Sequence, residues 1–114
     1  MKKMRQTKRV IPAHQPKGKL VLLVKEQRFD VTSVRDISPF GIGVYIERGV
    51  VIDEEVCLSY QTEAEECQVY GVVAWSASVK SDVVTQTTSL FRIGICLNPE
   101  NVESNLNFYR LMVD

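Results

Sequence analysis

Several features that mark common functional classes are missing from this sequence of 114 residues. It contains a single histidine, His14, and none of its three cysteines belongs to a C-x-x-C pair. We therefore expect no metal site, since such sites need clustered cysteine, histidine or carboxylate ligands. A G-x-x-x-x-G-K phosphate loop is also missing, and His14 lies between two prolines, where it makes a poor general base. These absences predict a protein without catalytic residues or cofactor, and hence not an enzyme.

Long apolar runs are missing as well, and this bears on location. The basic amino terminus is not followed by the apolar stretch of a signal peptide. No run approaches the roughly 20 apolar residues of a membrane span. Cys57, Cys67 and Cys96 are odd in number and lie in apolar runs, where a thiol packs as a small hydrophobe. We therefore expect a reduced, cytoplasmic protein that does not insert into a membrane.

The charges sum to zero but are unevenly distributed. No acidic residue precedes Glu26, whereas seven of the fourteen lysines and arginines lie in the first nineteen positions. A basic segment on an acidic body suits an anionic partner. That segment contains no aromatic residue, so it lacks the stacking platforms of single-stranded nucleic-acid sites. A nucleic-acid partner is therefore not expected.

Turn signals and apolar alternation predict a mainly β protein. Residues 1–18 contain two prolines and no apolar periodicity, and we interpret them as a flexible basic arm preceding a domain at residues 19–114. Six strands are predicted, at residues 19–25, 28–34, 42–47, 56–60, 67–77 and 90–97, with a long hairpin tip at residues 78–89. Closing these strands into an antiparallel, Greek-key-like β-barrel would remove exposed edges.

A C-terminal α-helix is predicted after the last strand. Asn98 is a suitable N-cap, and Pro99 fits the first turn. The helix should plug or flank one end of the barrel. Its core-facing stripe is predicted to consist of Val102, Leu106, Tyr109 and Val113, widened by Phe108 and Met112.

Two short motifs carry the functional prediction. In the arm, Arg5 and Arg9 form the pattern R-x-x-x-R. Between two predicted strands, Asp36, Ser38 and Gly41 form the pattern D-x-S-x-x-G in a tight polar corner. Alternate residues of an extended chain point to one face, so the carboxylate and the hydroxyl should lie together. Taken alone, this corner also fits an ordinary turn whose side chains cap local amides.

In this order and separation, the two motifs resemble those of the PilZ domain, a bacterial receptor module for cyclic di-GMP. The resemblance covers nearly the whole chain, including Ala74-Trp75-Ser76 and Arg92-Ile93-Gly94-Ile95. It implies a β-barrel receptor that binds cyclic di-GMP and is not an enzyme. It further implies that ligand binding changes the position of the arm and so signals to a downstream partner protein.

The resemblance also implies roles for individual residues. Arg5 and Arg9 would contact phosphate and guanine, Asp36 would accept from guanine N–H groups, Ser38 would add a hydroxyl contact, and Gly41 would shape the backbone. Lys8 and Arg35 are additional candidates for charge. Trp75 is interpreted as barrel packing.

Two departures from the family pattern affect this site. Phe40 stands where the family often has glycine, and Met4 adds no further cation before Arg5, which leaves open whether one ligand or a stacked pair is bound. An alternative function is a nucleotide-independent adaptor of the same fold. Its interaction surface would be an acidic face consisting of Tyr60, Glu63, Glu65 and Glu66.

Overall fold

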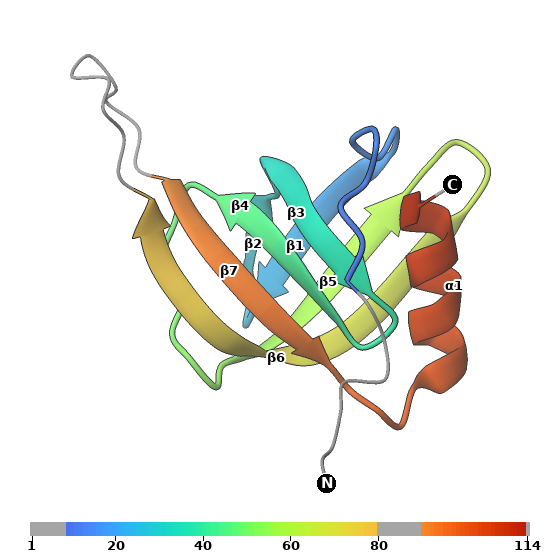
Figure 1. Cartoon of the computed structure of the whole chain (residues 1–114). Helices are drawn as coiled ribbons and strands as arrows, with labels where there is room; N and C mark the ends of the chain where they lie inside the picture. Colours follow the sequence, from blue (N-terminus) through green and yellow to red (C-terminus); the bar gives the residue numbers. More distant parts are fainter. Residues whose placement is uncertain (1–8, 80–89, 114) are drawn as a thin grey trace, which may run out of the picture.

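Residues 9–79 and 90–113, which the computed structural model describes, form seven antiparallel strands curled into a half-barrel and one C-terminal helix (Figure 1). This confirms the predicted fold class of an antiparallel, barrel-like β domain with a terminal helix. In chain order the elements are β1 (Lys19–Val24), β2 (Gln27–Asp30), β3 (Ser33–Ser38), β4 (Gly41–Ile46), β5 (Glu55–Gln61), β6 (Glu66–Val79), β7 (Leu90–Leu97) and α1 (Val102–Val113).

The strands are ordered β2-β1-β5-β6-β7-β4-β3 across the sheet, so β2 and β3 are its edges. The single strand predicted at residues 28–34 is in fact two strands, because the chain changes partner at Val31 and Thr32. The Val31 amide donates to Leu20 O of β1 at 3.1 Å, whereas the Thr32 amide donates to Tyr45 O of β4 at 2.8 Å. The apolar alternation of the sequence gave no sign of this exchange.

The polar corner predicted after that strand is a tight hairpin. β3 continues to Ser38 and β4 begins at Gly41, so only Pro39 and Phe40 form the turn. Ser38 pairs directly with Gly41 across the hairpin. Asp36 therefore lies within a strand, and strand pairing fixes its neighbours across the sheet.

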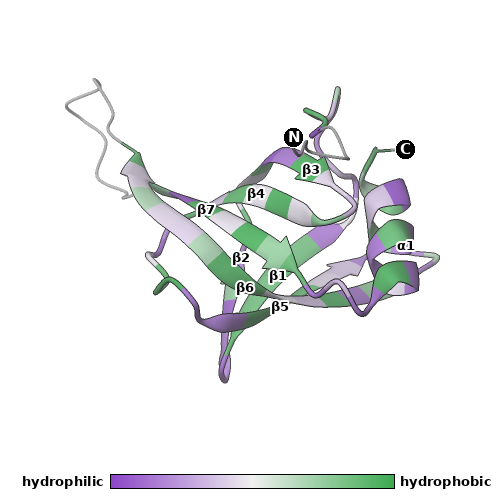
Figure 2. Ribbon diagram, turned by 60° about the horizontal axis from the view of Figure 1, so that its bottom comes forward, coloured by the Kyte–Doolittle hydropathy of each residue, from purple (hydrophilic) through white to green (hydrophobic). Residues whose placement is uncertain are grey.

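The inner face of the half-barrel holds the hydrophobic core. Hydrophobic and hydrophilic residues alternate along the strands (Figure 2), which sends one set inward. One inward row runs Ile37, Ile42, Ile95 and Val73 across β3, β4, β7 and β6, and all four residues are buried.

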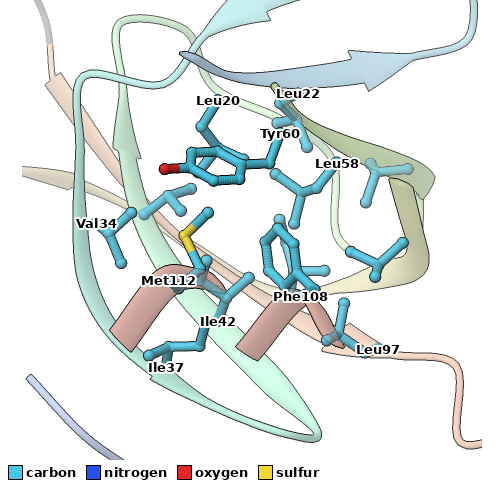
Figure 3. Close-up of a cluster of buried hydrophobic side chains, with 14 of the residues drawn as sticks. Leu20, Leu22, Val34, Ile37, Ile42, Leu58, Tyr60, Leu97, Phe108 and Met112 are labelled. Carbon is cyan, nitrogen blue, oxygen red and sulfur yellow. The ribbon is translucent and has the colours of Figure 1, made fainter. Parts of the chain in front are cut away.

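α1 closes one end of this core with only part of the predicted stripe, namely the two residues that were predicted to widen it. Its buried residues are Asn105, Phe108 and Met112, and Figure 3 shows Phe108 and Met112 among the side chains of the strands. Val102 and Leu106 are 49% and 39% exposed. Phe108 and Met112 were predicted correctly, and Tyr109 and Val113 pack partly on the core. Val102 and Leu106 were wrong, because the buried face centres on Phe108 and Met112, roughly 100° around the helix from them.

The start of α1 also differs from the prediction. Asn98 Oδ1 accepts a hydrogen bond from the Glu100 amide at 3.0 Å, but regular helix begins only at Val102. The Asn98 carbonyl accepts from Asn105 Nδ2 at 2.8 Å, so Asn98 ties the preceding turn to the buried face of the helix. α1 is the one helix among the described residues, and it is too short and too polar to cross a membrane.

Candidate functional site

A row of four residues crosses the outer face of the sheet from β3 to β6. Asp36 pairs with Gly43, Gly43 with Gly94, and Gly94 with Trp75. Directly paired residues of antiparallel strands point to the same face, and Ile37, the neighbour of Asp36, is buried on the opposite face. The row is therefore bounded by a carboxylate at one end and an indole at the other, with two glycines between. We call these four residues the glycine shelf.

Both glycines of the shelf are required by close approach. A Cβ on Gly43 would lie 2.8 Å from Asp36 Oδ1, and a Cβ on Gly94 would overlap the indole ring of Trp75. Neither glycine has a positive φ angle, so a special backbone conformation does not explain them. The Asp36 carboxylate and the Trp75 ring instead lean over the glycines, which any larger residue would prevent.

Asp36 is the electrostatic centre of the shelf. Its Oδ1 accepts hydrogen bonds from Arg9 Nε at 3.1 Å and Arg9 Nη2 at 2.8 Å. Its Oδ2 accepts from Arg35 Nη1 at 2.8 Å. Asp36 is buried, whereas the side chains of Arg9 and Arg35 are 36% and 42% exposed. Two guanidinium groups and one carboxylate leave net positive charge at this end of the shelf, which suits an anionic ligand.

Arg9 is held in place by the residues that follow it, which are hydrogen-bonded to the edge strand β3. Val10 and Ile37 form an antiparallel bridge with N–O distances of 2.7 and 2.9 Å. The side-chain amide of Gln15 imitates a strand: Oε1 accepts from the Val34 amide at 2.7 Å, and Nε2 donates to Val34 O at 3.1 Å. These bonds satisfy backbone groups that an open edge would leave unpaired.

Residues 9–18, which were predicted to belong to the arm, are thus hydrogen-bonded to the domain, and the flexibility of the arm stays a prediction. Their attachment ends at Gly18, whose amide donates to the hydroxyl of Tyr60 at 2.9 Å. Arg5, which was assigned to the ligand, and Lys8, which was an additional candidate, lie outside the described residues.

Gly41 and Ser38 lie in the next row of the same face. Gly41 pairs with Ser38 on one side and with Cys96 on the other. A Cβ on Gly41 would lie 3.2 Å from Arg9 Nη1, so this glycine leaves room for the guanidinium. Ser38 is buried, and its Oγ accepts a hydrogen bond from the Phe40 amide at 3.1 Å. Ser38 thus stabilises the hairpin, and its contact with a ligand stays a prediction.

Trp75 and Arg92 complete the surface, although neither was predicted to belong to the site. Trp75 is 37% exposed, and Arg92 Cζ lies 5.3 Å from the centroid of its ring. Simple alternation from the buried Val69 and Val73 would turn Trp75 inward. A bulge between Val73 and Trp75 reverses this, because it inserts one extra residue opposite β7. No feature of the sequence marks the bulge.

A hollow of about 110 Å³ lies between Arg9 and Trp75. Ligand pockets usually measure roughly 300–1,000 Å³, so a dinucleotide would lie across the shelf and not inside a cavity. A larger groove of about 390 Å³, near Tyr70 and Pro99, has no lysine or arginine in its lining. We place the site by its charged groups and not by its volume.

Comparisons with known proteins agree with this geometry at the level of the fold. Comparing the sequence with profiles of protein families gives no match, and comparing it with curated proteins gives none either. The structure is similar to the PilZ domain of YcgR from Escherichia coli with c-di-GMP, with a TM-score of 0.69 and 11% sequence identity. This similarity covers 96% of the present chain and 89% of the other.

A second similar structure is the MrkH–c-di-GMP complex of K. pneumonia, with a TM-score of 0.64 and 15% identity. The similarity again covers 96% of the present chain, which spans about half of MrkH (51%). The chain therefore has a PilZ-like fold.

Proposed function

We propose that this protein, with its PilZ-like fold, is a receptor domain that binds cyclic di-GMP, signals to a partner protein and catalyses no reaction. The observation that carries the proposal is the glycine shelf, with Arg9 and Arg35 beside Asp36 at one end and Trp75 at the other. Both similar structures contain c-di-GMP, which supports the same ligand class here.

The chemistry of these groups matches that of the ligand. Cyclic di-GMP carries two phosphates and two guanines. Arginine can contact a phosphate, or guanine O6 and N7, through two N–H groups at once, and its flat guanidinium stacks on bases. The Asp36 carboxylate would accept from the guanine N1–H and N2–H groups. Trp75, backed by Arg92, offers an aromatic surface for a base, and Gly43 and Gly94 let the base approach the sheet.

Binding in this way requires an exchange of partners at Asp36, because both carboxylate oxygens already accept from arginines. We propose that guanine displaces Arg35, which makes one hydrogen bond to Asp36, whereas Arg9 makes two. The freed Arg35 would then contact a phosphate. Arg9 could keep its two hydrogen bonds to Asp36 and contact the ligand as well. Its Nη1, which lies near Gly41, makes neither of these two hydrogen bonds and so is left for the ligand.

The proposed signal is a change in the position of the segment that precedes Arg9. Residues 10–18 are hydrogen-bonded to β3 and β5, so they form a fixed base. Arg5 is four positions before Arg9 and would join the ligand from this segment. Saturating cyclic di-GMP should slow tryptic cleavage after Lys3 and Arg5 and leave cleavage after Lys80 unchanged. Equal cleavage of the segment with and without ligand would contradict this mechanism even if the ligand binds.

Calorimetric titration tests the binding itself. Replacing Arg9 or Asp36 by alanine should weaken binding of cyclic di-GMP by about 10- to 150-fold, equivalent to roughly 1.5–3 kcal/mol for a lost hydrogen bond to a charged group. Arg28→Ala is the matched control, because Arg28 is an exposed arginine on β2. Thermal unfolding checks that each variant is folded. Unchanged affinity in folded Arg9→Ala and Asp36→Ala variants would refute the assignment.

Selectivity for the base gives a second test. Adenine presents an acceptor at N1 where guanine presents a donor, so Asp36 should disfavour cyclic di-AMP strongly. Sites built on such pairing can reject a mismatched ligand by up to about 10⁴-fold. Equal affinity for the two dinucleotides would exclude the proposed role of Asp36.

The alternative of a nucleotide-independent adaptor has less support. Tyr60, which was expected on its acidic face, is buried and accepts the hydrogen bond from Gly18. Glu63, Glu65 and Glu66 remain exposed. Failure of the wild-type protein to bind cyclic di-GMP would favour this alternative.

A further inference from the structure

α1 carries one stripe that is buried in the core and a second stripe that packs on the core only in part. The buried stripe consists of Asn105, Phe108 and Met112. The second stripe consists of Val102, Leu106, Tyr109 and Val113, and we call it the outer seam. Val102 and Leu106 are 49% and 39% exposed, whereas Tyr109 and Val113 pack partly against the core. Val102 and Leu106 lie one helical turn apart, so they form a small exposed apolar patch next to the half-buried Tyr109 and Val113.

The spacing of the outer seam is that of a helix pair. Its four residues follow one another at intervals of four, three and four positions. This is the alternation of a and d positions in a heptad repeat, with Val102 and Tyr109 at d and Leu106 and Val113 at a. A lone surface helix that packs only on its own sheet needs a single apolar stripe. The second stripe is therefore suited to pair with another α-helix.

The charges beside the outer seam select its partner. Glu103 in the first turn and Arg110 in the last turn both follow a d position, so they occupy equivalent positions on the solvent side of the seam. If two copies of α1 pack antiparallel, Glu103 of each copy lies beside Arg110 of the other. Antiparallel packing also opposes the two helix dipoles favourably. If the two helices packed parallel, neither Glu103 nor Arg110 would lie beside the oppositely charged residue of the other copy.

We propose that the outer seam is the interface of a homodimer in which two copies of α1 pack antiparallel about a two-fold axis near Leu106 and Asn107. Such an interface is isologous, so the Glu103–Arg110 pair occurs twice in each dimer. The helix has only 12 residues and is therefore about 18 Å long. The buried area is thus small, and the dimer should be weak.

The glycine shelf is built from β3, β4, β6 and β7 and includes no residue of the seam. The dimer does not rest on the proposed ligand, and it can be tested without it.

Sedimentation equilibrium of the ligand-free protein over a range of concentrations measures the dimer. Leu106→Glu should abolish association, because it places a charge at the centre of the seam. Ile52→Glu is the matched control, since Ile52 is also an exposed aliphatic residue, at 52%, but lies in the loop between β4 and β5. A wild-type protein that stays monomeric at millimolar concentration, or equal loss of association in both variants, would overturn the proposal.

Charge reversal tests the antiparallel arrangement. Glu103→Arg and Arg110→Glu should each weaken the dimer by about tenfold, because each places like charges together twice. The double variant, Glu103→Arg with Arg110→Glu, should restore the wild-type dissociation constant. Both substitutions oppose the helix dipole, so a general effect on stability would make the double variant worse than either single one. That outcome would refute the antiparallel pairing.

Discussion

The ion pair between Arg9 and Asp36 should contribute measurably to the stability of the ligand-free protein. Arg9 joins the attached segment of residues 9–18 to strand β3 through two hydrogen bonds, from Nε and Nη2 to Oδ1 of Asp36. A double-mutant cycle isolates this contribution, because it subtracts what each residue does alone. The required variants are Arg9→Ala, Asp36→Ala and the combination of both.

The expected coupling energy follows from the burial of the two partners. A hydrogen bond to a charged group contributes roughly 1.5–3 kcal/mol net, and Asp36 is buried enough for this range to apply. Exposed ion pairs contribute only about 0.2–1 kcal/mol, and the side chain of Arg9 is 36% exposed. An intermediate coupling of about 1–2 kcal/mol is therefore expected. In a domain of this size, 1 kcal/mol corresponds to a change in Tm of roughly 4–8 °C.

Urea denaturation of the four proteins without ligand provides the measurement. In the Arg9→Ala variant, Arg35 still lies beside Asp36. The cycle subtracts the energy of this second contact, so the coupling energy reports on Arg9 and Asp36. Combining Asp36→Ala with Lys25→Ala serves as the control, because Lys25 contacts Glu54 at 3.5 Å and not Asp36. The control coupling should be zero within error. A coupling between Arg9 and Asp36 below about 0.3 kcal/mol, the usual limit of additivity, would refute the reasoning.

Three further predictions follow from the packing. Phe108→Ala should destabilise the fold by about 3–5 kcal/mol in urea denaturation, because Phe108 is fully buried. A similar loss of stability in Leu106→Ala, at an exposed position, would contradict the burial of the Phe108 face of α1. Gly94→Ala should displace the indole of Trp75, the single tryptophan, and so change the intrinsic fluorescence, which the control Gly49→Ala should leave as in wild type. At pH 8, Cys96 should be alkylated first because it is exposed, while burial raises the pKa of the Cys57 and Cys67 thiols and leaves less reactive thiolate. Mass spectrometry should show that cyclic di-GMP slows alkylation of Cys96 alone; equal protection of Cys57 would point to a global effect.

Much of the fold was determined locally and could be predicted from the sequence. The strands β4, β5 and β7 show as apolar alternation between turn residues, because one face of each strand packs on the core. The D-x-S-x-x-G motif is also local, because Asp36, Ser38 and Gly41 lie within six positions of one another. It placed the candidate site where β3 turns into β4. The excess of positive charge near the amino terminus is likewise a property of the sequence alone.

Other features depended on tertiary contacts that have no local signal. The break at Val31 and Thr32 arises because the chain exchanges β1 for β4 as its partner. The position of Trp75 depends on a bulge opposite β7. Which stripe of α1 is buried was decided by the fit of Phe108 and Met112 into the open end of the half-barrel.

The candidate site shows the same division. The chain itself supplied an arginine, a carboxylate and several glycines, which are residue types suited to the ligand that we propose. Only strand order placed Gly43 and Gly94 side by side between Asp36 and Trp75, since β7 lies between β4 and β6 in the sheet. Periodicity reports the face on which a residue lies, whereas its neighbour across the sheet is set by pairing between strands distant in sequence.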